Sequence, residues 1–169
     1  GKTMNGGGFL LSSASNHIRC EYHFTPYLNN HYDMGGSQRR WKTIYSQNSL
    51  NTSDKNLKNS IADSDLGLSF VDKLRPVSYK WNQIEGEDSD KKTHYGFIAQ
   101  EIEAALTSES KTLDDFAGVF KPDAYKEDGT GEAMAISTGE LIAPLVKAIQ
   151  ELNAKLKVLE TKVATLEAA

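Results

Sequence analysis

A regular heptad repeat over residues 142–166 constrains this chain more than any other feature of its sequence. The spacing between successive apolar residues alternates between three and four positions: Ile142, Leu145, Ile149, Leu152, Leu156, Leu159, Val163 and Leu166. This spacing is typical of a coiled-coil helix with a positions at 142, 149, 156 and 163 and d positions at 145, 152, 159 and 166. We therefore expect a long C-terminal helix whose apolar seam packs against other copies of the chain.

Charged residues flank the seam in a pattern that favours parallel association. Lys155 and Lys162 occupy g positions, and Glu160 and Glu167 occupy e positions of the following heptads. In a parallel assembly each lysine lies opposite a glutamate of a neighbouring chain and attracts it. Isoleucine at a with leucine at d favours two strands, but Leu156 at an a position weakens that preference. The repeat therefore predicts a parallel oligomer without fixing its number of chains.

The expected start of this helix carries two signals. Ser137 and Glu140 match the S-x-x-E capping box, in which the two side chains satisfy backbone amides at a helix N-terminus. Pro144 lies inside the apolar pattern, and because proline has no amide hydrogen it should kink the helix or mark its true start. The simpler interpretation of the whole stripe is a helix that packs on its own domain.

The residues before this helix alternate between strand and helix patterns, which predicts an α+β fold. Helical spacing predicts a helix in "SDLGLSFVDKLRP", with Ser64 as N-cap and Pro76 as its stop, and "HYGFIAQEIEAAL" predicts a short strand that runs into a helix. A turn is expected at Gly35–Gly36. Strands are expected in "HIRCEYHF" (17–24), "RRWKTIYS" (39–46), "VSYKW" (77–81), near 118–120 and in "MAIS" (134–137).

The charge of the chain changes sign near residue 52. Residues 1–52 carry five basic and two acidic side chains, which gives +3, and since the whole chain carries −4 the remainder carries −7. An acidic C-terminal part argues against nucleic acid as a partner. The sequence holds no apolar run of about 18 residues, so we expect no membrane span. The single cysteine, Cys20, excludes an intrachain disulfide and indicates synthesis in a reducing compartment.

Four potential metal ligands lie near the N-terminus: His17, Cys20, His23 and His31. In the expected strand, Cys20 points to the face opposite His17 and His23, because side chains alternate between the two faces. Ligands on opposite faces cannot converge on one ion, as a zinc site requires. Three-fold symmetry could still gather copies of one histidine at an axis, but since a zinc site needs convergent ligands we expect no metal and no cofactor.

The polar segment "NTSDKNLKNSI", residues 51–61, holds a serine and a lysine five residues apart. A serine needs a base to act as a nucleophile, and a lysine can be that base if desolvation lowers its pKa from about 10.4 to roughly 7–8. Taken alone, Ser53 and Lys58 indicate an ordinary exposed turn, because a serine and a lysine at this spacing are common in any sequence. His94, directly before "YGF", is likewise more often structural than functional when taken alone.

Five segments in order resemble the C-terminal intramolecular chaperone domain of phage endosialidases, tailspikes and tail fibres. They extend over roughly residues 35–155, and although each motif alone is weak, their order is specific. The segments are "GGSQRRWKTIYSQNSLNTSD", "TSDKNLK", "LGLSFVDKLRPVSYKW", "HYGFIAQE" and "ELIAPLVKAIQEL".

The resemblance implies a chaperone that cleaves itself. Domains of this family trimerise through their C-terminal helices, assist the folding of the β-rich stalk ahead of them, and cut themselves off before the serine of an "SD" motif. Carried over to this chain, the scissile bond is Thr52–Ser53, Ser53 is the nucleophile and Lys58 is the base. Asp54 would orient the site, and His94 would support it.

The resemblance also implies how the chain is divided into domains and where each cleavage product goes. Residues 1–52 would form the end of a β-rich stalk, 53–136 a mixed α/β chaperone and autoprotease domain, and 137–169 the trimerisation helix. The expected fold is a trimeric α+β assembly whose partners are its own copies and the upstream stalk, with no nucleic acid, membrane or cofactor. The chain would be made in the cytoplasm of the bacterial host, the stalk would enter the virion tail, and the chaperone part would be released.

Two other functions are compatible with the residues. A permanent, non-enzymatic trimeric fibre tip could bind a host receptor through its basic N-terminal part, and it predicts an uncut chain in virions. A Ser/Lys peptidase that acts on other proteins predicts turnover of added substrates.

Overall fold

The computed structural model describes residues 11–12, 17–18, 25–36, 39–41, 43–82 and 92–168. The chain divides into two units, Gly1–Thr43 and Ile44–Ala169. Most of the first predicted strand, including Cys20 and His23, lies outside the described residues.

The described residues of the first unit include a short strand pair and a glycine turn. Strands β1 (Leu11–Ser12) and β2 (His17–Ile18) pair antiparallel, so β2 confirms the start of the first predicted strand. Gly35 has a φ of 97°, which favours glycine, and Gly36 and Arg39 exchange two backbone hydrogen bonds of 3.1 Å. The expected turn is thus confirmed.

The second strand predicted near the N-terminus, over residues 39–46, is wrong for the part that the structure describes. Arg39 forms only an isolated bridge to Gly36, and residues 40–41 and 43–46 join no ladder. The aromatic residues that suggested a strand face, Trp41 and Tyr45, are 60% and 93% exposed. Strand propensity mainly reflects packing on a neighbouring surface, and neither side chain is covered by one here.

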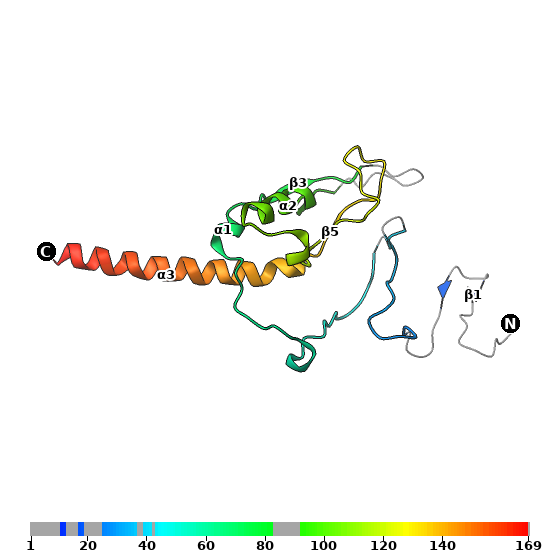
Figure 1. Ribbon diagram of the computed structural model, residues 1–169, viewed down its shortest axis with the longest axis horizontal. Helices are drawn as coiled ribbons and strands as arrows, with labels where there is room; N and C mark the ends of the chain where they lie inside the picture. Colours follow the sequence, from blue (N-terminus) through cyan, green and yellow to red (C-terminus); the bar gives the residue numbers. More distant parts are fainter. Residues whose placement is uncertain are drawn as a thin grey trace. The chain divides into compact units, whose positions relative to one another are not determined.

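The second unit combines short helices and small sheets with one long helix, which confirms the expected α+β class (Figure 1). Its elements are the 3₁₀ turns η1 (Lys55–Leu57), η2 (Leu113–Asp115) and η3 (Thr138–Leu141), the helices α1 (Leu68–Val71), α2 (Ala99–Ser108) and α3 (Ile142–Glu167), and the strands β3 (Val77–Tyr79), β4 (His94–Gly96), β5 (Val119–Phe120) and β6 (Ala135–Ile136).

The strands of this unit form two antiparallel pairs at the predicted places. In the β3–β4 pair, Val77 lies opposite Gly96 and Tyr79 opposite His94. In the β5–β6 pair, Val119 lies opposite Ile136. Helix α2 follows β4 directly, as the motif "HYGFIAQEIEAAL" predicted.

Helix α1 is a single turn and does not begin where the sequence indicated. Its N-cap is Gly67, whereas the hydroxyl of Ser64 donates a hydrogen bond of 2.9 Å to the carbonyl of Leu66. The prediction of Ser64 as the N-cap is therefore wrong. Leu66 and Phe70 are both buried in the same core. Their spacing, which suggested a longer helix, therefore reflects two side chains that pack in this core and not one continuous helix.

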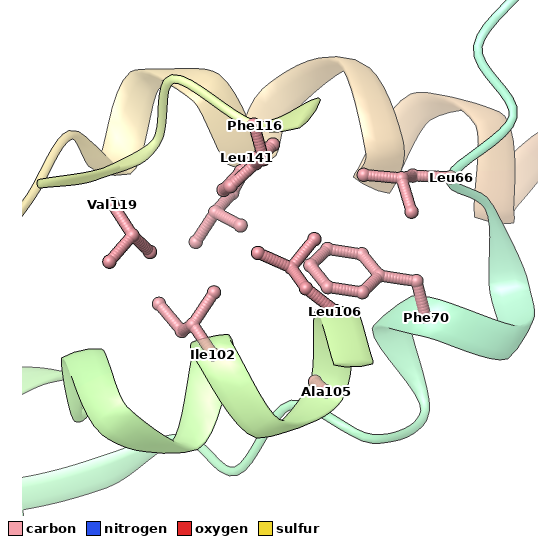
Figure 2. Close-up of a cluster of buried hydrophobic side chains, with 8 residues drawn as sticks. All are labelled: Leu66, Phe70, Ile102, Ala105, Leu106, Phe116, Val119 and Leu141. Atoms are coloured by element: carbon pink, nitrogen blue, oxygen red, sulfur yellow. The ribbon is translucent and has the colours of Figure 1, made fainter. Parts of the chain in front are cut away.

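A cluster of eight buried apolar side chains joins α1, α2, β5 and the turn before α3: Leu66, Phe70, Ile102, Ala105, Leu106, Phe116, Val119 and Leu141. Figure 2 shows Ile102 and Leu106 pointing from α2 toward Leu141. The rings of Phe70 and Phe116 meet edge to face, with their centroids 6.0 Å apart. This cluster fixes the segment after residue 65 to the start of α3.

Replacing Phe70 by alanine should lower the free energy of unfolding by about 3–5 kcal/mol, because the ring is fully buried and its loss leaves a cavity. Urea unfolding followed by circular dichroism measures the change. Leu57, which is 73% exposed, provides the control, since Leu57→Ala should change stability by less than about 0.5 kcal/mol. Equal unfolding midpoints for the two variants would contradict this description of the core.

Helix α3 begins at Ile142, directly after η3, so Pro144 lies in its first turn. The prediction that the proline marks the start is confirmed. The capping box is wrong, because the Ser137 side chain makes no capping hydrogen bond. The amide of Glu140 instead donates to the Ser137 carbonyl at 3.1 Å, since the tight 3₁₀ turn satisfies it.

The first turns of α3 present two different apolar faces. Leu141, Pro144 and Ala148 are buried in the chain's own domain, and they occupy g and c positions of the heptad. The a and d residues of the seam are all 41–76% exposed: Ile142, Leu145, Ile149, Leu152, Leu156, Leu159, Val163 and Leu166. The helix thus packs on its own domain through one face and leaves the heptad seam open.

Ion pairs fasten α2 and the loops around it. Lys73 binds Glu109, Lys111 binds Asp65 at 2.6 Å, and both acids have a lowered pKa. For Glu109 the main cause is the hydrogen bond from Lys73, followed by one from Ser69.

Acidification should therefore weaken the fold. A carboxyl whose pKa is lower in the folded than in the unfolded chain stabilises fully above the ordinary pKa, about 4.3 for glutamate. That stabilisation is lost as the pH falls through the folded-state pKa. Thermal unfolding between pH 7 and pH 2 measures the effect, which should be small because both ion pairs lie at the surface, with Asp65 exposed and Glu109 only half-buried. Glu109→Gln should flatten this pH dependence, and an unchanged profile would argue against the Lys73 pair.

Candidate functional site

Ser53 and Lys58 lie side by side in the polar segment that precedes the core. The Nζ atom of Lys58 donates a hydrogen bond of 2.7 Å to the Oγ atom of Ser53. The structure thus brings together a potential nucleophile and a potential base at a distance that permits proton transfer.

One 3₁₀ turn, η1, produces this proximity. The carboxylate of Asp54 accepts a hydrogen bond of 2.7 Å from the amide of Asn56 and so caps the turn. The amide of Leu57 bonds to the Asp54 carbonyl at 3.1 Å, and the amide of Lys58 closes the turn. Aspartate is a preferred N-cap, and a 3₁₀ helix makes a full turn in three residues. The local sequence "SDKNLK" therefore folds its lysine back toward its serine.

The whole segment is open to solvent in the single chain. Residues 51–61 are exposed, and among them Leu57 and Ile61 present apolar side chains at 73% and 65% exposure. A lysine acts as a base only in its neutral form, which burial favours. The single chain provides the geometry of the pair but not its burial.

His94 lies in an aromatic cluster on the β3–β4 hairpin. Its ring stacks on Tyr79, with centroids 5.5 Å apart and an interplanar angle of 25°, and it meets the edge of Trp81 at 6.2 Å. The side chain is half-buried, and Trp81 is exposed. These contacts give His94 a packing role, and its supporting role in the chemistry stays a prediction.

The described residues hold no group of three or more His, Cys, Asp or Glu side chains that could bind a metal. His31 meets the ring edge of Tyr32 at a centroid distance of 4.9 Å. In the same part of the chain, no helix is both long and apolar enough to cross a membrane.

One polar contact in the domain that follows this segment was not predicted from the sequence. Glu151 of α3 accepts a hydrogen bond of 2.9 Å from the backbone amide of Leu68. The heptad pattern places Glu151 at an outer c position, where a charged residue is ordinary, so its role depends on a distant segment that periodicity does not identify.

Comparison with known proteins bears on this segment directly. Residues 53–111 match the model of a peptidase family described as "Chaperone of endosialidase". The match begins at Ser53, and it confirms the resemblance inferred from the ordered motifs. No curated protein matched the chain.

Two solved structures are similar. One is the carboxy-terminal domain of the bacteriophage T5 L-shaped tail fibre with its intra-molecular chaperone domain: the sequences are 20% identical, the TM-score is 0.54, and the match covers 83% of this chain and 38% of that one. The other, described as a novel intramolecular chaperon, is 23% identical with a TM-score of 0.38, and covers 64% of this chain and 99% of that one. At this identity the first likeness shows a shared fold.

Proposed function

We propose that this chain is the intramolecular chaperone end of a phage tail fibre or tailspike, and that it releases itself by cutting the Thr52–Ser53 bond. The observation that carries the proposal is the 2.7 Å hydrogen bond between Lys58 Nζ and Ser53 Oγ. The family match that begins at Ser53 supports the chaperone role.

The reaction is an attack by the chain on its own backbone. Neutral Lys58 takes the hydroxyl proton while Ser53 Oγ forms a bond to the carbonyl carbon of Thr52, giving a tetrahedral intermediate. The C–N bond then breaks, and the Ser53 nitrogen leaves as an amine after it receives that proton from Lys58. Water hydrolyses the resulting ester, which releases the Thr52 carboxylate and restores the Ser53 hydroxyl.

This arrangement needs no substrate-binding cleft. The attacked carbonyl belongs to the residue directly before the nucleophile, so its effective concentration is high. Asp54 contributes by capping the turn that holds Lys58 against Ser53. One turnover per chain completes the task.

Assembly supplies the burial that the single chain lacks. In our proposal three parallel copies associate through the exposed a and d seam of α3, with Lys155 and Lys162 facing Glu160 and Glu167 of neighbouring chains. Burial of residues 51–61 among the copies favours the neutral lysine. Cleavage then follows assembly and reports that the trimer has formed.

The proposed organisation follows from the cut. Residues 1–52 are the end of the stalk, 53–136 the chaperone and autoprotease domain, and 137–169 the trimerisation helix. The stalk part carries +3 and goes to the virion tail, whereas the chaperone part carries −7 and is released. The chain is made in the cytoplasm of the bacterial host.

Intact mass spectrometry of the purified protein over time tests the proposal. The expected products are residues 1–52 and 53–169, with oligomeric state measured on the same samples. A chain that stays whole in assembled virions would instead support a permanent fibre tip, for which exposed Tyr27, Tyr32 and Trp41 offer a binding surface. Turnover of added peptides would identify a peptidase that acts on other proteins.

A further inference from the structure

The carboxylate of Glu151 on helix α3 binds the backbone of α1, which follows the Ser53–Lys58 pair by ten residues in the sequence. Glu151 Oε2 accepts a hydrogen bond of 2.9 Å from the backbone amide of Leu68, the first residue of α1. Glu151 is half-buried, and α1 packs against α3 around it. The amide of a first helical residue has no partner inside its own helix, so the carboxylate satisfies an otherwise unpaired donor.

Gly67 leaves the space that this hydrogen bond needs. A Cβ atom added there would lie 2.6 Å from Glu151 Oε1 and 2.8 Å from Oε2, closer than such atoms approach one another. Glycine therefore allows the carboxylate to reach the backbone of α1. In the sequence "LGL" at 66–68, Gly67 makes room for the carboxylate, and the residue before it, Leu66, is buried in the core.

These contacts are the first firm attachments of the chain after the reactive pair. Residues 59–63 are exposed, and attachment begins with the ion pair of Asp65 and Lys111 and the burial of Leu66. Glu151 adds the attachment that comes from α3. The backbone at 65–68 is thus the place where the segment that carries residues 53–58 joins the folded domain.

The turn of α3 that carries Glu151 also carries the seam. Ile149 at a and Leu152 at d flank it in the sequence, and both are more than half exposed in the single chain. An assembly that fixes these seam residues also fixes Glu151, and through it the amide of Leu68. The same helical turn therefore connects neighbouring copies with the segment that leads to the reactive pair.

We propose that Glu151 is a positioning residue that couples the assembly of α3 to the placement of Ser53 and Lys58. This inference rests on the proposed self-cleavage. Glu151 touches neither reacting group, and it acts through the backbone of Gly67 and Leu68.

Cleavage rates of assembled protein test the coupling. Glu151→Ala and Glu151→Asp, which removes one methylene and withdraws the carboxylate, should each cleave at least about tenfold more slowly than the unmodified chain. Glu151→Gln keeps an oxygen that can accept from the Leu68 amide, so its rate should stay within about threefold. Gln150→Ala, at the neighbouring exposed b position, is the matched control and should cleave normally.

Hydrogen exchange separates positioning from general destabilisation. In assembled, uncut Ser53→Ala protein, Glu151→Ala should speed exchange at the Leu68 amide and across residues 53–66, while amides at Ile102 and Leu106 keep their protection. If Glu151→Ala fails to assemble, the cleavage rates of Glu151→Asp and Glu151→Gln test the coupling instead, and the aspartate variant should be the slower of the two.

Wild-type cleavage rates in assembled Glu151→Ala and Glu151→Asp would overturn the coupling. A Glu151→Gln variant that cleaves more slowly than Glu151→Asp would also overturn it, and so would unchanged hydrogen exchange over residues 53–66. An unmodified chain that is never cut would overturn the proposed self-cleavage instead. The exchange measurement does not depend on cleavage, so it still decides whether Glu151 positions the segment.

Discussion

Replacing Ser53 by alanine should leave the chain whole at the Thr52–Ser53 bond, with the cleavage rate reduced by at least about 10³-fold. The hydroxyl oxygen is the only atom of this residue that can form the ester, and alanine has none. Lys58→Ala should have an effect of similar size, because residues that act as a unit lose most of their effect when either is removed. Intact mass measured against time on assembled protein gives both rates.

Lys55→Ala is the matched control for Lys58→Ala. Lys55 belongs to the same 3₁₀ turn and is also exposed, but the hydrogen bond to Ser53 Oγ comes from Lys58. The control should therefore cleave at the unmodified rate. If Ser53→Ala is still cut at this bond by its own activity, Ser53 is not the nucleophile. If Lys55→Ala and Lys58→Ala slow cleavage equally, the effect belongs to the stability of the turn and not to a base.

The pairing of Ser53 with Lys58 could be predicted from the sequence, but only through the order of several motifs. Ser53 and Lys58 five residues apart are ordinary in any polar segment. The local physics that brings them together is nevertheless short-range, because Asp54 caps a turn that the lysine closes. The turn in "SDKNLK" can therefore be predicted from the local sequence once the surrounding motifs have drawn attention to this segment.

Elements were predicted where periodicity reflects burial on one surface, and they were missed where it does not. Helix α2 and the strand around Tyr79 follow such periodicity, whereas the seam of α3 has a helical period that the single chain leaves exposed. Leu66 and Phe70 share helical spacing, yet only the second lies in a helix, since both positions are set by the core that they enter. The contact of Glu151 with Leu68 joins residues far apart in sequence, and no local pattern encodes it.

Charging the seam should dissociate the proposed oligomer while leaving each domain folded. Leu152 and Leu159 are both d residues, 51% and 56% exposed in the single chain, so Leu152→Asp with Leu159→Asp removes little of the chain's own packing. In an assembled seam each change loses about 1.5–3 kcal/mol of leucine burial and adds the cost of desolvating a carboxylate. Because every chain carries both changes, the concentration needed for assembly should rise by more than about 10³-fold.

Light scattering coupled to gel filtration measures the mass of the assembly, and the same samples give the cleavage rate. The control places the same two aspartates at b positions, Gln150→Asp with Lys157→Asp, with the same spacing on the exposed side of the helix. We expect the control to assemble and cleave, and the seam variant to be monomeric and uncut. A seam variant that stays oligomeric would show that α3 is not the interface. A monomeric seam variant that cleaves normally would show that assembly does not complete the site, since burial of Lys58 by neighbouring copies would then be unnecessary.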